Sequence, residues 1–121
     1  MNARALLLLA VAACGGEEAA PPDALFRSWR RSPEEDAQGV LVYRPSEYRF
    51  PPSRGREGLE IARDGSVTEL RIAPADGLLR RPGRWTWQPP DKLVIELAED
   101  RAQPLVLLVR DVDGEKLVIA R

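Results

Sequence analysis

The sequence predicts an all-β fold, namely a small antiparallel up-and-down barrel of about eight short strands. Strand-forming runs recur at the spacing of about 8–12 residues that is typical of sandwiches and barrels. The runs are residues 26–31, 39–44, 57–63, 66–73, 83–88, 92–98, 104–111 and 115–121. Most of the loops between these runs are only a few residues long. Such short loops join antiparallel strands, because parallel pairs need long crossovers. Closure of the sheet into a barrel would remove its exposed edges.

Turn-forming residues separate these runs. Asp64-Gly65 and Asp113-Gly114 can adopt the positive φ that tight hairpins need. Gln88-Pro89-Pro90-Asp91 interrupts two apolar runs, because proline has no N–H to donate to a sheet. Ser32-Pro33-Glu34-Glu35 has the pattern of a capping box with proline at the first helical position. It predicts a single helical turn that ends near Gly39.

The N-terminal segment differs in composition from the rest of the chain. Arg4 precedes an apolar run over residues 5–13, which is shorter than the roughly 20 residues that span a bilayer and fits an export signal. Val11-Ala12-Ala13-Cys14 resembles the lipobox of bacterial lipoproteins. The resemblance implies a signal peptide over residues 1–13, cleavage before Cys14 and a diacylglycerol on its thiol. The alternative is an ordinary secretory signal followed by an incidental cysteine.

Residues 14–22 have no apolar periodicity and predict a flexible, lipidated tether, which leaves residues 23–121 as the barrel domain. Two or more acyl chains would hold the protein stably on a membrane. In the lipoproteins of two-membrane bacteria, aspartate after the cysteine often retains the protein at the inner membrane. Gly15 stands there instead, which favours the periplasmic face of the outer membrane.

The start of the domain resembles the opening strand of lipocalin-like, calycin-type proteins. Leu25-Phe26-Arg27-Ser28-Trp29 has a tryptophan where that family has Gly-x-Trp, with Arg27 in place of the glycine. Gly83-Arg84-Trp85 matches the motif in its letters but lies in mid-domain. The resemblance implies that Trp29 lies inside the barrel across its closed end. It also implies that an arginine near the last strand, at about Arg121, packs over that tryptophan.

Composition argues against most chemistry. The chain has no histidine, and Cys14 is its only cysteine, so we expect no disulfide, no thiol nucleophile, no metal site and no cofactor. With 18 Lys and Arg against 19 Asp and Glu, the charge is nearly balanced, which argues against a nucleic-acid partner. No serine has a histidine to activate it, and the aspartates that could form a glycosidase-like pair lie at predicted turns. We therefore expect a protein that is not an enzyme.

Trp85 and Trp87 lie two residues apart and therefore share one face of a strand. Leu93, Ile95 and Leu97 share a face of the next predicted strand, where they would meet the tryptophans across a hairpin. The functional interpretation is an aromatic wall for an apolar or sugar ligand. The structural interpretation, which we favour, is packing in the core.

Residues 44–57 form a long proline-rich loop, and such loops are usually functional or disordered. Arginine fits the geometry of carboxylates and phosphates, so Arg54 and Arg56 could form an anion-binding lip at the barrel mouth. We favour the alternative that these arginines pair with acidic residues close in sequence and hold the loop down. The candidate acids are Glu34, Glu35, Asp36 and Glu57.

Residues 105–109 and 117–120 are apolar at every position, whereas a half-exposed strand should alternate with polar residues. One interpretation is an exposed stripe for a partner or for lipid. We favour the other, in which residues 25–31 or the loop 45–56 cover these strands, because a long exposed stripe invites aggregation.

These observations predict a membrane-anchored, non-enzymatic interaction or structural module of the cell envelope, which presents the arginine loop or an edge strand to an envelope partner. The alternative is a lipocalin-like carrier of a small apolar ligand. Eight short strands enclose an interior that side chains alone can fill. A cavity of about 300 Å³ or more lined by Trp85 and Trp87 would favour the carrier.

Overall fold

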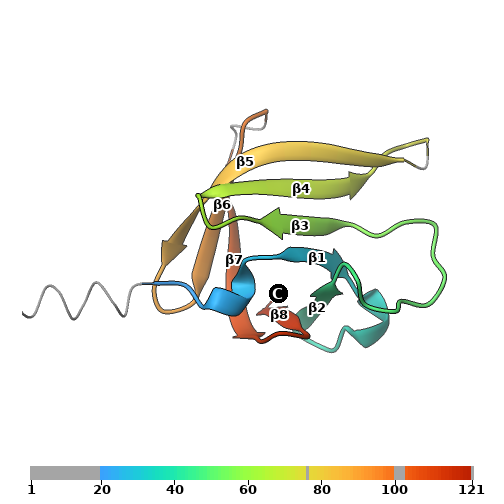
Figure 1. Cartoon of the computed structure of the whole chain (residues 1–121), viewed down its shortest axis with the longest axis horizontal. Coiled ribbons are helices and arrows are strands. Elements are labelled where there is room, and N and C mark those ends of the chain that lie inside the picture. Colours follow the sequence, from blue (N-terminus) through green and yellow to red (C-terminus); the bar gives the residue numbers. More distant parts are fainter. Residues whose placement is uncertain (1–19, 76, 100–102, 121) are drawn as a thin grey trace, which may run out of the picture.

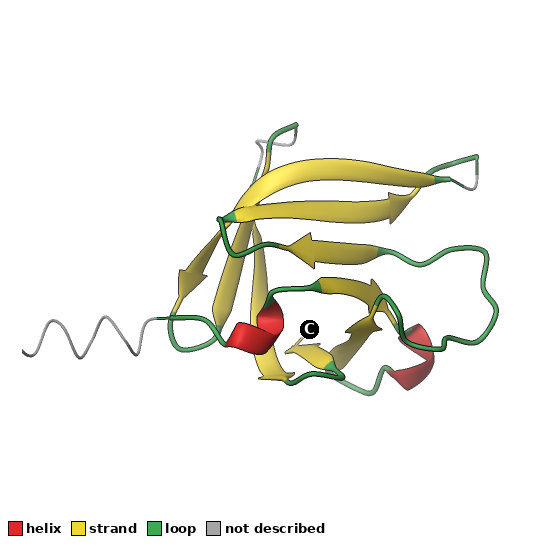
Figure 2. Ribbon diagram, in the orientation of Figure 1, coloured by secondary structure: helices red, strands yellow, loops and turns green. Residues whose placement is uncertain are grey.

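A computed structural model describes residues 20–75, 77–99 and 103–120. Eight strands form one closed antiparallel barrel (Figures 1 and 2). The strands are β1 (Ser28–Arg31), β2 (Val40–Pro45), β3 (Gly58–Ile61), β4 (Ser66–Ile72), β5 (Leu78–Gln88), β6 (Lys92–Leu97), β7 (Leu105–Val112) and β8 (Leu117–Ala120). Two short 3₁₀ turns, η1 (Asp23–Leu25) and η2 (Pro33–Glu35), precede β1 and β2. The predicted all-β barrel is confirmed. A helical turn does follow Ser32, but it ends at Glu35 rather than near Gly39, and the Ser32 side chain does not cap it.

The strand order departs from a simple meander at the first two strands. Strands β3 to β8 pair consecutively, but β1 lies between β2 and β3, and β2 closes the barrel on β8. Since β1 is antiparallel to both neighbours, β2 and β3 run in the same direction. Parallel strands need a long crossover, and residues 46–57 provide it.

The crossover, residues 46–57, returns the chain along the length of β1. It begins where the Ser46 N–H donates to the Ser28 carbonyl and ends where the Arg31 N–H donates to the Glu57 carbonyl. Side chains fill the interior of the barrel, so this segment runs outside the wall (Figure 1).

The barrel has two distinct ends. The tether end holds η1 and the β3–β4, β5–β6 and β7–β8 turns, and the chain enters there from Ala20 (Figure 1). Two arginines join η1 to these turns: Arg63 pairs with Asp23 at 3.1 Å, and Arg27 donates to the Gly114 carbonyl at 2.6 Å. The far end holds η2, the β4–β5 turn and the β6–β7 connection. The β4–β5 hairpin projects on the side of the molecule opposite to the entering chain (Figure 1).

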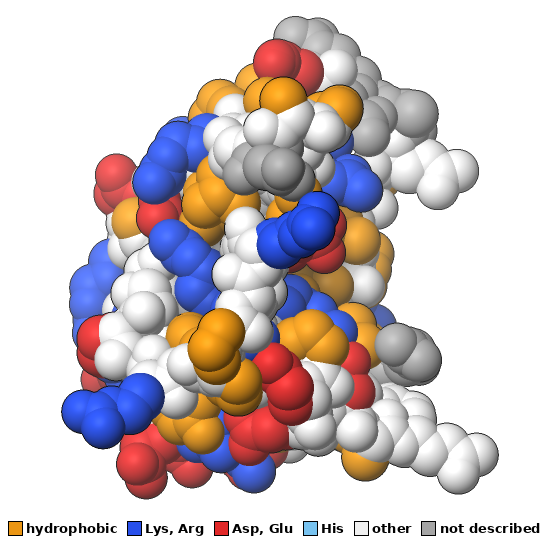
Figure 3. Space-filling model, turned by 90° about the vertical axis from the view of Figure 1, so that its right-hand side faces the viewer, with side chains coloured by type: hydrophobic (Ala, Val, Ile, Leu, Met, Phe, Trp, Pro, Cys, Tyr) orange, Lys and Arg blue, Asp and Glu red, His pale blue; other side chains and the backbone are white. Residues whose placement is uncertain are grey.

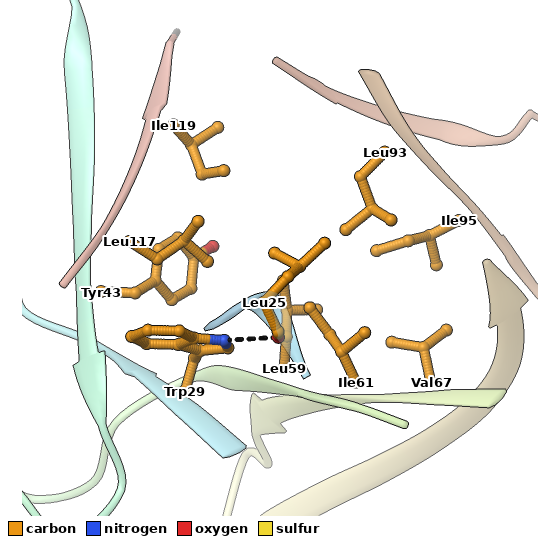
Figure 4. Close-up of a cluster of buried hydrophobic side chains, with 10 residues drawn as sticks. All are labelled: Leu25, Trp29, Tyr43, Leu59, Ile61, Val67, Leu93, Ile95, Leu117 and Ile119. Atoms are coloured by element: carbon orange, nitrogen blue, oxygen red, sulfur yellow. Dashed lines mark hydrogen bonds between the residues drawn. The ribbon is translucent and has the colours of Figure 1, made fainter. Parts of the chain in front are cut away.

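Inward side chains fill the barrel with an apolar core (Figure 4). Its buried members are Leu25, Trp29, Tyr43, Leu59, Ile61, Val67, Leu93, Ile95, Leu117 and Ile119. Trp29 is 0% exposed, and its indole N–H donates to the Leu25 carbonyl over 3.0 Å. The predicted interior position of Trp29 is thus confirmed. Arg27 lies over its ring, 5.4 Å from the ring centroid, whereas the predicted Arg121 lies outside the described residues.

The two Asp-Gly turns differ in backbone conformation. Gly65 has a φ of +96°, as predicted. The prediction is wrong for Gly114, whose φ is not positive. The Asp113 carboxylate instead accepts hydrogen bonds from the N–H groups of Glu115 and Lys116, and these bonds shape the turn.

Strand β5 begins at Leu78 rather than at residue 83, so it continues through Pro82. In an antiparallel strand the N–H and C=O of one residue point to the same side. The Pro82 carbonyl accepts from the N–H of Ala98, which follows β6, so its nitrogen also points away from β4. The missing N–H therefore breaks no bond between β4 and β5, and the hairpin can extend beyond the barrel wall.

Candidate functional site

Of the predicted contact residues, Trp85 and Trp87 belong to the core rather than to an open site. They lie opposite Ile95 and Leu93 on β6, on the shared face that the sequence predicted. Both are half-buried and pack against the apolar core. The Trp85 indole N–H donates to the Ala62 carbonyl over 2.7 Å. Cys14, the predicted lipidation site, lies outside the described residues.

Acidic residues of η2 form ion pairs with the crossover and with β2. Arg56 forms a two-point ion pair with Glu34, with N–O distances of 2.8 and 2.6 Å. Arg44 pairs in the same way with Glu35, at 2.8 and 2.6 Å. Bidentate pairs are the strong form of the arginine–carboxylate interaction. Arg56 is therefore engaged within the fold, with an acid that the sequence indicated.

Arg54 differs from Arg56. Its side chain is exposed, and within the described ranges no hydrogen bond, ion pair or ring contact involves it. The same holds for the exposed Arg49. Of the two predicted arginine contacts, Arg54 thus keeps an unengaged guanidinium group.

The ion pairs of η2 predict acid sensitivity. Hydrogen bonds from Arg56 to Glu34 and from Arg44 to Glu35 lower the pKa of each carboxyl from 4.5 to about 2. A carboxyl whose pKa is lowered by folding stabilises the folded state. This stabilisation is complete above the unfolded-state pKa and is lost as the pH falls through the folded-state pKa. The free energy of unfolding should therefore fall between about pH 4.5 and pH 2, as measured by urea melts across that range. Glu35→Gln should flatten this slope, and an unchanged slope in that variant would contradict the assignment.

The outer face of β7 is exposed, which overturns the favoured prediction that residues 105–109 are covered. On this face Val106 is 51% exposed and Leu108 36%. Neither of the expected covering segments lies over β7. Residues 28–31 are themselves a strand of the wall, paired with β2 and β3. Residues 46–57 run along β1 instead. They have to connect β2 to β3, which point in the same direction on either side of β1.

A pocket of about 260 Å³ opens at the far end of the barrel. It is lined by Tyr43, Glu57, Gly58, Leu59, Glu69, Leu70, Arg71 and Leu105. Glu69 Oε1 is buried without a hydrogen-bond partner, 3.7 Å from Nη1 of Arg81. Burial raises the pKa of Tyr43. Arg31 lowers this pKa, and the Glu57 and Glu69 carboxylates raise it, so that the net shift is upward. The Tyr43 phenol therefore stays protonated and can donate a hydrogen bond.

A second depression, of about 450 Å³, lies beside the β6–β7 connection. It is lined by Gly83, Arg84, Glu96, Leu97, Ala98, Gln103 and Pro104. Neither this depression nor the far-end pocket is lined by Trp85 or Trp87. Neither of these two pockets is therefore walled by the tryptophans of β5.

The far end also carries exposed apolar side chains. Ile72, Leu78 and Leu79, at the end of the β4–β5 hairpin, are 48%, 45% and 50% exposed. Figure 3 views the molecule from this side and shows apolar, basic and acidic side chains interspersed. The far end is therefore a mixed surface with an apolar hairpin tip and with Arg54, which has no partner within the described ranges.

Comparison with family models, with curated proteins and with solved structures gives no match for this chain. Of the residues that the structure describes, no group of three or more His, Cys, Asp or Glu side chains could hold a metal ion. None of the described helices is long and apolar enough to cross a membrane.

Proposed function

We propose that this chain is a membrane-anchored lipoprotein whose barrel is a non-enzymatic interaction module of the cell envelope, on the periplasmic face of the outer membrane. The supporting observation is that the chain enters the barrel at one end and exposes apolar side chains at the other. The chain enters at the tether end, whereas the exposed apolar hairpin tip lies at the far end (Figure 1). A lipid on Cys14 would keep the tether end next to the bilayer and direct the far end into the periplasm.

The reach of the tether supports this orientation. Residues 14–22 extend at most about 30 Å, so the barrel would stay close to the membrane. At the tether end, Arg27 and Arg63 are engaged with the turns and with η1. At the far end, Leu78, Leu79 and Arg54 are exposed. Aliphatic and arginine side chains in one surface suit a protein partner. Because the barrel is closed, the hairpin tip rather than an edge strand is the proposed contact.

A second candidate function is the binding of a small, largely apolar ligand in the far-end pocket. It is favoured by Glu69 Oε1, which is buried without a hydrogen-bond partner 3.7 Å from Arg81, and by the Tyr43 phenol in a pocket that Leu59, Leu70 and Leu105 also line. A volume of about 260 Å³ suits a ligand smaller than most drug-sized molecules. This candidate comes second, because core side chains fill the rest of the interior.

Cys14→Ser should abolish lipid attachment, because the proposed lipid is carried by the Cys14 thiol. The measurement is metabolic labelling with a radioactive fatty acid, followed by fractionation of the envelope. We expect the parent chain to be labelled and membrane-bound, and the variant to be unlabelled and unprocessed at this site. A labelled Cys14→Ser variant in the membrane fraction would refute the lipoprotein proposal.

A photoreactive amino acid at Leu79 should form a specific adduct with an envelope protein in living cells. The matched control is the same amino acid at Gln88, an exposed position of β5 at the tether end. Adducts at residue 79 and not at residue 88 are expected. Equal adducts at both positions would refute the far end as the contact. A co-purifying small molecule without any adduct at residue 79 would favour the second candidate.

A further inference from the structure

The β4–β5 hairpin has an open backbone edge where it extends beyond the barrel wall. Strand β6 pairs with β5 no further than Gly83, after which the Ala98 N–H donates to the Pro82 carbonyl. Among the described strands, residues 78–81 pair with β4 only. The closed wall has no edge, but this half of β5 therefore has one, and it forms the upper margin of the molecule in Figure 1.

The register of the hairpin identifies the backbone groups that face this edge. The Ala73 N–H donates to the Gly77 carbonyl, so hydrogen-bonded pairs recur at every second residue and include Leu79 of β5. The N–H and C=O groups of Leu78 and Arg80 consequently point away from β4. Within the described ranges, no backbone hydrogen bond satisfies these four groups. The edge thus offers two donors and two acceptors at the spacing of a strand.

Neighbouring segments leave this edge open. The connection from β6 to β7 soon turns back, because Leu105 already pairs with Ile95. The opposite edge of the hairpin differs, since only Ile72 has outward backbone groups beyond β3. The crossover lies next to it: a Cβ atom at Gly55 would be 4.0 Å from the Ile72 side chain. An open strand edge is a template for pairing with another strand, and here that edge belongs to β5.

The side chains beside the edge are two leucines and two arginines. Leu78 and Leu79 are 45% and 50% exposed. The Arg80 guanidinium pairs with Glu60 at 2.9 Å, yet its side chain remains 59% exposed. Opposite charges on adjacent strands stabilise their pairing, and like charges destabilise it. An added strand is therefore favoured if its side chains are apolar and acidic, and disfavoured if they are basic.

We propose that the partner protein adds an extended segment, with apolar and acidic side chains, as a further strand along residues 78–81. This inference rests on the proposed function, which places the contact at the hairpin tip, and specifies the form of that contact. Main-chain hydrogen bonds give such strand addition its affinity, and the neighbouring side chains give it specificity. A bilayer does not fit the edge, because unpaired N–H and C=O groups are costly in hydrocarbon.

A second copy of the chain fits the edge poorly. A twofold pairing that uses all four backbone groups is centred on Leu79. It aligns Gly77 of each copy with Arg81 of the other. The hairpin turn would then reach Pro82, whose carbonyl is already bonded to Ala98. A linear segment has no such turn, so it can pair along the edge without this collision.

Proline substitution tests the backbone contact directly. Arg80→Pro removes one outward N–H and no bond to β4, as Pro82 already does two residues further along the strand. The matched control, Arg80→Ala, loses the same side chain but keeps the N–H. Both are made in the full chain with a photoreactive amino acid at Leu79, in living cells. The adduct with the envelope partner should persist in Arg80→Ala and fall several-fold in Arg80→Pro.

Urea melts of the two variants should coincide, which shows that the hairpin is intact. If Arg80→Pro proves unstable, Leu78→Pro against Leu78→Ala makes the same comparison at the other outward N–H. Equal adducts in the proline and alanine variants would overturn strand addition and leave the hairpin tip as the contact. No adduct in the parent chain would overturn the proposed function as well.

The identity of the adduct tests the chemistry of the occupant. Mass spectrometry should locate the crosslink in a segment of the partner that carries apolar and acidic residues. A crosslink to a basic segment or to a helix would overturn the proposal. An adduct with the mass of two copies of this chain would do so too, because it would assign the edge to self-association.

Discussion

Trp29→Ala is expected to lower the free energy of unfolding by about 3–5 kcal/mol, a large share of the roughly 5–15 kcal/mol that holds a domain together. Trp29 is fully buried in the core cluster beside Leu25 and Tyr43. Its removal would leave a cavity and would also deprive the Leu25 carbonyl of the indole N–H. Urea denaturation followed by far-ultraviolet circular dichroism measures the loss.

Arg54→Ala is the matched control. Its side chain is exposed and unengaged within the described ranges, so the expected change is within about 0.5 kcal/mol. Equal small losses for both variants would contradict the interior position of Trp29. A large loss for Arg54→Ala would instead show that the crossover is fastened to the barrel through that arginine.

The number, type and approximate bounds of the strands could be predicted because they depend on local signals. Apolar alternation and turn residues at short spacing specify each strand, and Gly65 adopts the positive φ that its turn requires. The contact between the two tryptophans and the apolar face of β6 followed in the same way, and the observed register places Trp85 opposite Ile95.

The order of β1 and β2 could not be predicted, because local patterns do not specify which strands pair across the barrel. The one available signal was the length of segment 46–57. It is too long for a hairpin turn and is in fact the crossover between two parallel strands. Missing that role led to the wrong expectation that this segment covers β7.

The candidate site was predictable only in part, for a related reason. The pairing of Arg56 with an acid of η2 followed from proximity in sequence. The far-end pocket brings together Tyr43, Glu69 and Leu105 from β2, β4 and β7, and no sequence spacing indicates that meeting. The exposed hairpin tip was missed because Pro82 concealed the first half of β5.

Gly58→Ala is expected to lower the free energy of unfolding by about 3 kcal/mol, the upper part of the usual range for overpacking. Gly58 opens β3 between Arg30 of β1 and Leu70 of β4. Its backbone conformation is not left-handed, so the effect would be steric. A Cβ atom there would lie 2.2 Å from the carbonyl oxygen of Trp29, a backbone atom that cannot move aside alone. The methyl group would therefore force β1 away from β3 where β3 begins.

Gly114→Ala is the control for Gly58→Ala. It also replaces a glycine by alanine, but without a steric clash. A Cβ at Gly114 would have nothing within 4 Å, and its φ is not positive, so the expected change is within about 0.5 kcal/mol. Urea melts of both variants decide the matter, and equal small changes would contradict the close approach of β1 and β3. Because the displaced carbonyl belongs to Trp29, Gly58→Ala should also perturb the buried indole and shift the tryptophan fluorescence of the folded protein. In Gly114→Ala the folded-state spectrum should remain that of the parent chain.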